Sequence, residues 1–213
     1  MSALKSARFA ACVAVLMLTG TSNASGDADV RAAAEPFEKL AETAFTASQA
    51  TLDKTFSEAD AAAKRVRTLL SDQAGKELDT QLSALNAALR KQDRATVALA
   101  SIEVYRVLVS SVTEGAKVPT EVNLLDYAGF RYNADLKAVP TRWSDMAEAV
   151  SVAKQQWKAL APRVKSPDLE AKVSKALAAM EQAVEHKNKS AAARSVKAEL
   201  DLVDQLEKHF ASH

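Results

Sequence analysis

The sequence predicts an all-α protein, folded as an up-and-down antiparallel helical bundle. Apolar residues recur with helical spacing almost from end to end, and no segment alternates convincingly with a period of two. Glycine and proline interrupt the pattern at a few points and leave short connections between the segments. Short connections favour antiparallel neighbours, as in helical bundles.

Four apolar stripes show the period most clearly, and each is typical of the buried face of a packed helix. They are Leu78, Leu82, Leu85 and Leu89; Trp143, Ala147, Val150, Ala153, Trp157 and Leu160; Leu169, Val173, Leu177, Met180 and Val184; and Val196, Leu200, Val203, Leu206 and Phe210.

About eight helices are expected, with ends accurate to two to four residues. Breaks are predicted near Gly75, from Gly115 to Pro119, at Pro140, and at Pro162 and Pro167. Ser57 is predicted to cap the second helix, with Asp60 in its first turn. The expected helices are 28–54, 57–71, 76–91, 94–113, 121–138, 141–161, 167–187 and 190–210.

These helices form two sets of four that resemble each other. Shifted by 95 residues, Leu78 meets Val173 and Leu82 meets Leu177, and with one further residue of slippage Glu103 meets Glu199. We interpret this as a faded internal duplication, with a first helical set at 25–115 and a second at 116–213. The alternative is that two Ala/Leu helices share a period because each has one packing face.

The first 24 residues are typical of a secretory signal peptide. Lys5 and Arg8 precede an apolar run from residue 9 to residue 18, and Ser22 and Ala24 suit the −3 and −1 positions of a cleavage site. The run is too short to span a bilayer, which needs roughly 20 apolar residues. We therefore predict a soluble protein, exported to a bacterial periplasm and beginning at Ser25.

The mature chain carries balanced charge and no thiol. Cys12 leaves with the leader, as do Lys5 and Arg8, so that 26 basic residues face 27 acidic ones. No run of like charge predicts a nucleic-acid or membrane-surface site, and no second stretch is long and apolar enough to be a transmembrane segment. Without disulfides, packing alone must hold the exported fold together.

The expected helix 121–138 differs from the others because it carries rings on two faces. Leu125 and Tyr132 lie on one face, Tyr127 and Phe130 lie on the other, and Gly129 would permit close approach of a backbone or ligand. The candidate ligand or partner site at this seam between the halves comprises Asp126, Tyr127, Phe130, Arg131, Tyr132 and Arg142. The alternative is a helix wedged between the halves with both faces packed.

The sequence contains no recognised catalytic motif, so we expect no enzyme. His-x-x-Glu, Gly-x-Ser-x-Gly and phosphate-binding glycine loops do not occur. The carboxylate pairs Asp126/Asp135 and Glu199/Asp201 are interpreted as solvated charges on helix faces. No cofactor is identified; non-covalent b-type haem, held by His209 with Met146 or Met180, is a minor option.

Two functions therefore remain as hypotheses. The first is an exported binding protein that holds a small ligand, a cofactor or metal, or a protein partner at the seam between its halves. The second is a structural module of the cell envelope that docks a partner protein through its bundle faces. Aromatic and Arg side chains among polar neighbours favour the first, because recognition surfaces have this composition. The oligomeric state is not predicted.

Overall fold

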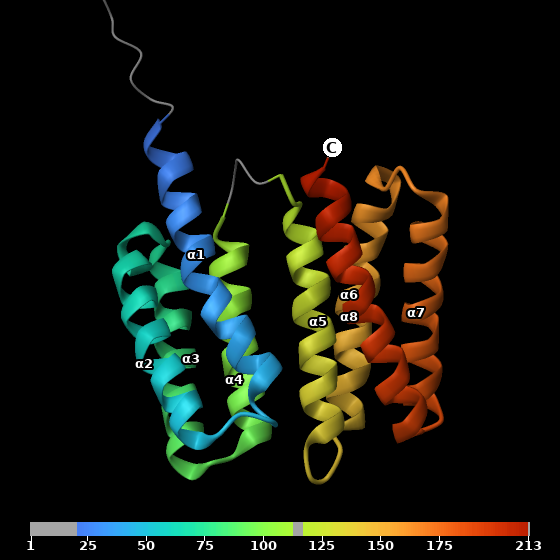
Figure 1. Cartoon of the computed structure of the whole chain (residues 1–213), viewed down its shortest axis with the longest axis horizontal. Helices are drawn as coiled ribbons and strands as arrows, with labels where there is room; N and C mark the ends of the chain where they lie inside the picture. Colours follow the sequence, from blue (N-terminus) through green and yellow to red (C-terminus); the bar gives the residue numbers. More distant parts are fainter. Residues whose placement is uncertain (1–20, 113–116, 213) are drawn as a thin grey trace, which may run out of the picture.

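The structure of the protein is a computed structural model that describes residues 21–112 and 117–212, with side chains from residue 26 onward. Over these residues the regular structure is entirely helical, with eight α-helices and two short 3₁₀ turns and no strand (Figure 1). The all-α helical bundle predicted from the periodicity is confirmed. The predicted leader lies outside the description, except for the backbone of its last four residues, which begins the first helix.

The helices follow one another with short connections. They are α1 (Thr21–Thr43), α2 (Gln49–Val66), α3 (Asp72–Lys91), α4 (Arg94–Ser110), α5 (Thr120–Lys137), α6 (Trp143–Leu160), α7 (Pro167–Glu185) and α8 (Lys189–Ala211), with 3₁₀ turns η1 (Arg67–Leu69) and η2 (Ala161–Arg163).

Helices α1–α4 and α5–α8 lie side by side, with α4 and α5 in contact at the centre and α1 and α8 both on the face toward the viewer (Figure 1). A single cluster of buried apolar side chains runs through both sets. The two sets therefore share one core, and α5 is the helix that contacts both α4 of the first set and α6 and α8 of the second.

Polar side chains start five of the helices by accepting a hydrogen bond from a backbone N–H of the first turn, which would otherwise have no intrahelical partner. The accepting residues are Ser48, Ser71, Asp93, Ser166 and Asn188. These caps fix where the helices begin.

The predicted boundary between the first two helices was wrong. The first helix ends at Thr43 rather than at 54, and Ser57 lies inside α2 instead of capping it. The cap is Ser48, whose hydroxyl accepts from the N–H of Thr51. No glycine or proline marks this turn, which is why a search for chain breakers missed it.

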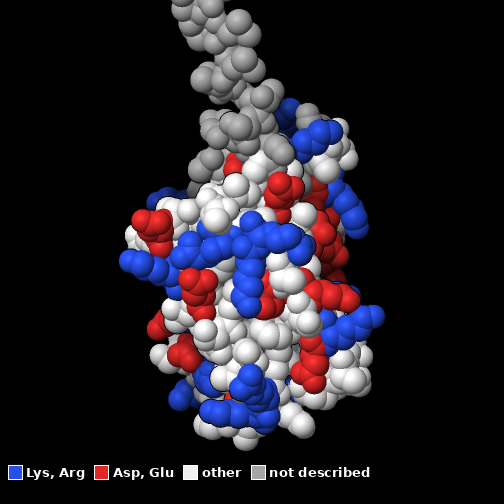
Figure 2. All heavy atoms as spheres, turned by 90° about the vertical axis from the view of Figure 1, so that its left-hand side faces the viewer, with Lys and Arg blue, Asp and Glu red and all other residues white. Residues whose placement is uncertain are grey.

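The described part of the chain contains no helix long and apolar enough to cross a membrane. Seen from the α2 side, the surface carries basic and acidic side chains interspersed, with basic groups forming a band across the middle (Figure 2).

Candidate functional site

The six residues predicted to form a site do not come together; they separate onto three sides of α5. Tyr127 and Arg131 point toward α4 and α6, where hydrogen bonds hold them. Tyr132 is fully buried inside the second set, and Arg142 lies just before α6. Asp126 and Phe130 line a groove between α1, α5 and α8.

Tyr127 and Arg131 belong to a network of polar side chains that crosses the middle of the molecule. The hydroxyl of Tyr127 donates to Oε1 of Glu103 on α4 at 2.6 Å, and Nη2 of Arg131 donates to Oε2 of Glu148 on α6 at 2.9 Å. The pKa of Tyr127 is raised to about 12, mainly by burial and then by the charge of the neighbouring Glu103.

Arg106 extends the same network toward the first set. It donates to Glu103 at 2.8 Å and to Glu77 on α3, and its guanidinium lies 5.9 Å from the centre of the Tyr127 ring. Because Tyr127 and Arg131 are already bonded within the fold, they connect the helical sets, as the alternative of a wedged helix predicted.

Tyr132 and Arg142 are likewise occupied by internal contacts. The Tyr132 hydroxyl donates to the backbone oxygen of Met180 at 3.2 Å, inside the second set. Arg142 lies 3.7 Å from the Asp135 carboxylate, which is 1% exposed. Burial raises the pKa of Asp135 to about 6, with a further contribution from the charge of Asp145.

The groove beside Asp126 and Phe130 has a volume of about 430 Å³. Its floor is α5, with Asp126, Phe130 and Asn133; its walls are α1, with Glu38 and Glu42, and α8, with Ala193, Val196, Lys197, Leu200, Asp201 and Asp204. Lys197 is the only cation among these lining residues, and its ammonium lies 2.6 Å from the Asp201 carboxylate. We call this hollow the acidic groove.

A buried carboxyl lies at the α5–α8 contact beside this groove. Glu199 is 1% exposed, and neither of its side-chain oxygens has a hydrogen-bond partner among the described residues. A Cβ at position 129 would collide with Oε2 of Glu199, so this carboxyl lies against the backbone of α5 at Gly129. On α5, Gly129 stands between Asp126 and Asn133 on one helix face, and both of those residues line the groove.

Burial holds protons on the carboxyls of this region. It raises the pKa of Glu199 well above the ordinary value, and it does the same for Asp126, where Glu38 and Glu199 add to the effect. The pKa of Glu38 rises to about 7, mainly through burial and then through the charges of Glu207, Glu42, Glu35 and Asp204. Burial therefore shifts these three carboxyls, Glu38, Asp126 and Glu199, toward the neutral form.

The interpretation of Asp126, Asp135 and Glu199 as solvated charges was wrong, because the structure buries all three. Glu199 was missed for an identifiable reason. The stripe chosen on α8 ran through Leu200 and Phe210, whereas the buried positions include Ala192, Val196, Glu199, Leu202, Val203 and Leu206. A glutamate within such a stripe was the available signal.

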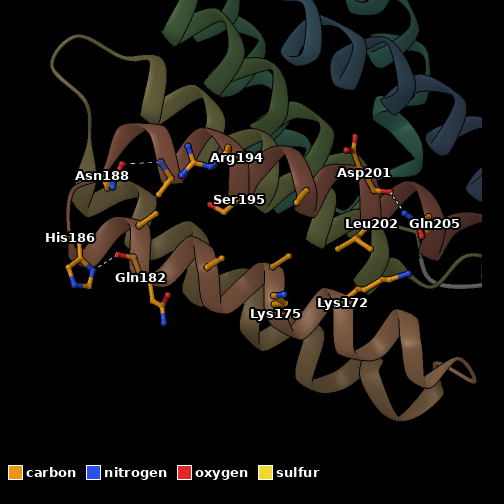
Figure 3. A pocket seen from close by; sticks show the side chains of 15 residues that line it. Lys172, Lys175, Gln182, His186, Asn188, Arg194, Ser195, Asp201, Leu202 and Gln205 are labelled. Carbon is orange, nitrogen blue, oxygen red and sulfur yellow. Dashed lines mark hydrogen bonds between the residues drawn. The ribbon is translucent and has the colours of Figure 1, made fainter.

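A second hollow of about 750 Å³ lies between α7 and α8 (Figure 3). Small and apolar side chains, among them Ala176, Ala183 and Leu202, form its base, while Lys172, Lys175 and Arg194 stand along it. Near the connection between the two helices, the polar groups serve the helix ends: the ring of His186 bonds the Gln182 carbonyl, and Asn188 caps α8. The buried Ser195, which also lines this hollow, donates its hydroxyl to the Ala192 carbonyl at 3.1 Å, so the described residues of the lining include no unpartnered buried polar group such as Glu199.

The described residues contain no cluster of three or more His, Cys, Asp or Glu side chains arranged to hold a metal ion. The minor haem option is not supported by the helix directions. Met146 lies in the first turn of α6 and Met180 in the last turns of α7, whereas His209 lies near the C-terminal end of α8, where its Nε2 faces the Lys165 N–H at 3.4 Å. The methionines and His209 are thus at opposite ends of the second set (Figure 1).

No protein-family model matches the chain, and the searches of curated proteins and of solved structures found no significant match either. Its function must therefore be inferred from the geometry of the groove.

Proposed function

We propose that the protein is an exported, non-enzymatic binding protein that holds a small ligand in the acidic groove between α1, α5 and α8. The observation that carries the proposal is the buried Glu199 carboxyl, without a hydrogen-bond partner among the described residues, beside a groove lined by the nearly buried Asp126.

Such carboxyls lower the stability of a fold unless something uses them. An unpaired polar group in an apolar interior costs roughly 1–3 kcal/mol by mutational data, and a leucine would suit the surroundings of Glu199 better. Buried titratable groups with strongly raised pKa values beside a cleft are typical of functional sites. This combination favours a ligand site over packing alone.

The position of the groove supports the same proposal. Ligand sites are common at the junctions of domains and between the helices of bundles, and here α1 of the first set faces α8 of the second across α5. Phe130 is partly buried and lines the floor, so an apolar surface lies next to the carboxyls. The leader-like segment of residues 1–24 supports export to the periplasm.

A module that docks a partner protein is the second candidate, and the hollow between α7 and α8 is the observation in its favour. Its base of small and apolar residues, with lysine and arginine along its length, would accommodate the side chains of an amphipathic segment. The two hollows share only Asp201 among their lining residues, so mutation of the other residues can separate the two candidates.

The test is recovery of bound molecules from the protein purified under native conditions from a periplasmic extract. Native mass spectrometry of the wild type is compared with Phe130→Ala, which alters the groove, and with Phe56→Ala, a matched control on α2 outside it. A small molecule that is retained by the wild type and the control but lost from Phe130→Ala supports the proposal. Equal retention by all three proteins, or no retained small molecule, contradicts it.

A further inference from the structure

Building on the proposed binding function, we propose that the ligand of the acidic groove is a small organic cation with two or more ammonium or guanidinium groups joined by an aliphatic chain. The charge of the lining residues is the first reason. Five carboxyl groups line the groove, on Glu38, Glu42, Asp126, Asp201 and Asp204, against the single ammonium of Lys197.

Lys197 does not offset this excess, because its ammonium is paired with Asp201 at 2.6 Å. Glu42 is paired in the same way with Lys39 at 2.6 Å, whereas Glu38, Asp126 and Asp204 form no ion pair with a basic side chain among the described residues. A ligand that brings positive charge would offset the repulsion between the ionised forms of these carboxyls, which disfavours their ionisation in the free protein, whereas an anionic ligand would add to it.

The spacing of the carboxyls favours several separated charges over one. Glu38 and Glu42 are one helical turn apart on the α1 wall, about 6 Å along the axis, and Asp126 lies on the floor between that wall and the acids of α8. The acids are thus distributed along and across the groove. An extended molecule with charges at intervals matches this distribution.

A metal ion matches it less well. Calcium takes six to eight oxygen ligands at about 2.3–2.6 Å, which requires the carboxylates to converge on one point. The described residues include no convergent group of three or more such ligands. The acids here are spread along the groove and do not converge on one position that a metal ion could occupy.

The apolar part of the groove fits the carbon chain of such a cation. Phe130 on the floor supplies an aromatic ring, and such rings attract ammonium and guanidinium groups. Val196 and Leu200 on the α8 wall would contact methylene groups. A simple inorganic cation would leave this apolar surface unused.

Glu199 is a buried acid beside the groove, and although it is not one of the lining residues, its charge acts on Asp126, which is one of them. Its unpartnered oxygens lie at Gly129, one turn from Asp126 on the face of α5 that forms the floor. An ammonium group that reached Asp126 would therefore approach Glu199 as well and would favour the ionised form of both carboxyls. Once ionised, both carboxylates would attract the positive charge of the ligand instead of being buried neutral groups that lower the stability of the fold.

The experiment is isothermal titration calorimetry of the full mature protein at pH 8 with spermidine, putrescine and the uncharged analogue 1,4-butanediol. Asp126→Asn combined with Glu199→Gln keeps the shape of both side chains and removes their charges. The matched control, Glu148→Gln combined with Glu181→Gln, makes the same change of net charge at exposed salt bridges outside the groove. Circular dichroism checks that each variant is folded.

We expect the wild type to bind spermidine more tightly than putrescine and not to bind the diol. The groove variant should lose at least tenfold in affinity for spermidine, and the control should stay within about twofold. Similar affinities in the groove variant and the wild type would overturn the assignment. So would an equal loss in the control, since that would indicate attraction by overall charge.

The same measurements separate this inference from the proposed function. If neither amine binds but native mass spectrometry finds a neutral or anionic molecule that depends on Phe130, the ligand class is wrong and the binding function stands. If a basic peptide but no small amine binds in a groove-dependent way, the ligand is a macromolecule and the inference fails. If neither amines nor any retained molecule depends on the groove, both proposals fail.

Discussion

The Glu199 side chain fits against α5 because residue 129 is a glycine and has no side chain. Oε2 of Glu199 and Cδ2 of Leu200, which lies 2.7 Å from an ideal Cβ at position 129, occupy the space beside the glycine. The sequence indicated that something approaches α5 at this residue, but not what. The structure identifies a buried carboxyl, which an amphipathicity argument would place in solvent.

Gly129→Ala should therefore destabilise the fold even though alanine favours helices. The added methyl group must displace Glu199, which is fully enclosed, at a cost of about 1–3 kcal/mol in the free energy of unfolding. Combining it with Glu199→Ala removes the collision, so the two changes should couple by roughly 0.5–3 kcal/mol in a double-mutant cycle measured by urea denaturation. Strictly additive effects would show that the two side chains do not meet.

Tyr127 and Arg131 should prove to be stabilising residues. Because both are bonded within the network that joins α4, α5 and α6, replacing both with alanine should cost about 3 kcal/mol or more, through lost packing and unpaired partners. Thermal melts measure this, with Phe130→Ala on the groove side as the comparison, where the ring is partly exposed and the loss should be smaller. A double variant as stable as the wild type would instead support a role of these two residues in recognition.

At the scale of helices, the periodicity predicted the elements well, and errors arose where the chain turns without glycine or proline. Five connections contain a proline or glycine or follow the predicted positions closely. The break predicted near Gly75 was wrong, because α3 begins at Asp72 after the cap Ser71 and Gly75 is buried inside it. The turn after Thr43 depends on the local hydrogen bonds of Ser48. Serine is common on helix surfaces, so the sequence gives two similar candidates, Ser48 and Ser57. Only the tertiary packing of α1 and α2 decides between them.

Ser48→Ala should lower the free energy of unfolding by about 1 kcal/mol, since the N–H of Thr51 loses its acceptor at the start of α2. Ser57→Ala is the matched control, because Ser57 lies inside the same helix and alanine favours a helix interior. Its effect should stay within roughly 0.5 kcal/mol. Chemical denaturation of both variants decides which serine is the cap, and the opposite order would contradict the structure.

Only part of the candidate site was predicted correctly, and the cause is again missing tertiary information. The two-faced pattern on α5 correctly placed this helix between the sets, but a helical wheel cannot tell which neighbour covers which face. Tyr127 and Phe130 share a predicted face, yet Tyr127 reaches α4 while Phe130 lines the groove with α8. The arrangement of α1 and α8 around α5 is tertiary information that no single segment contains.

At the scale of the whole molecule, the burial of side chains agrees only in part with the predicted internal duplication. Phe37 on α1 and Tyr132 on α5, 95 residues apart, are both fully buried. The slippage that paired Glu103 with Glu199 does not match the burial, because the Glu103 side chain is 23% exposed and Glu199 is buried. A constant shift pairs Glu199 with Val104, which is also buried.

The same shift shows how the two sets differ. Ile102 and Tyr105 of α4 are buried where α4 packs next to α5, but their counterparts on α8 are Lys197 and Leu200, which line the acidic groove. Among the described residues, no helix packs on this face of α8 as α5 packs on α4. The groove is thus the space that a packed helix covers in the first set, with polar residues in place of apolar ones.

The processing prediction also concerns the whole chain. Cleavage after Ala24 would remove the first turn of α1, but the buried residues of this helix begin at Val30. The mature fold should therefore lose no described core contact. Mass spectrometry of the exported protein should find Ser25 at or near its N-terminus, and recovery of intact Met1 from a membrane fraction after export would contradict the prediction.

Finally, the raised carboxyl pKa values predict an unusual dependence of stability on pH. Glu38, with a pKa of about 7, and Asp135, with a pKa of about 6, bind protons more tightly in the folded protein than in the unfolded chain, where their ordinary values are 4.5 and 3.8. The burial of Asp126 and Glu199 acts in the same direction. Their contribution favours folding at pH 4–5 and is lost as the pH rises through the folded-state values.

The free protein should therefore melt several degrees higher at pH 5 than at pH 8, since about 1 kcal/mol shifts the melting temperature of a chain of this size by roughly 2–4 °C. Spermidine should act in the opposite sense, because it binds the ionised groove: its stabilisation should be larger at pH 8 than at pH 5. In Asp126→Asn combined with Glu199→Gln, both pH effects should be weaker. A melting temperature that rises from pH 5 to pH 8 in the free protein would mean that these carboxyls are ionised and paired in the fold. They would then carry no proton that a bound cation could displace.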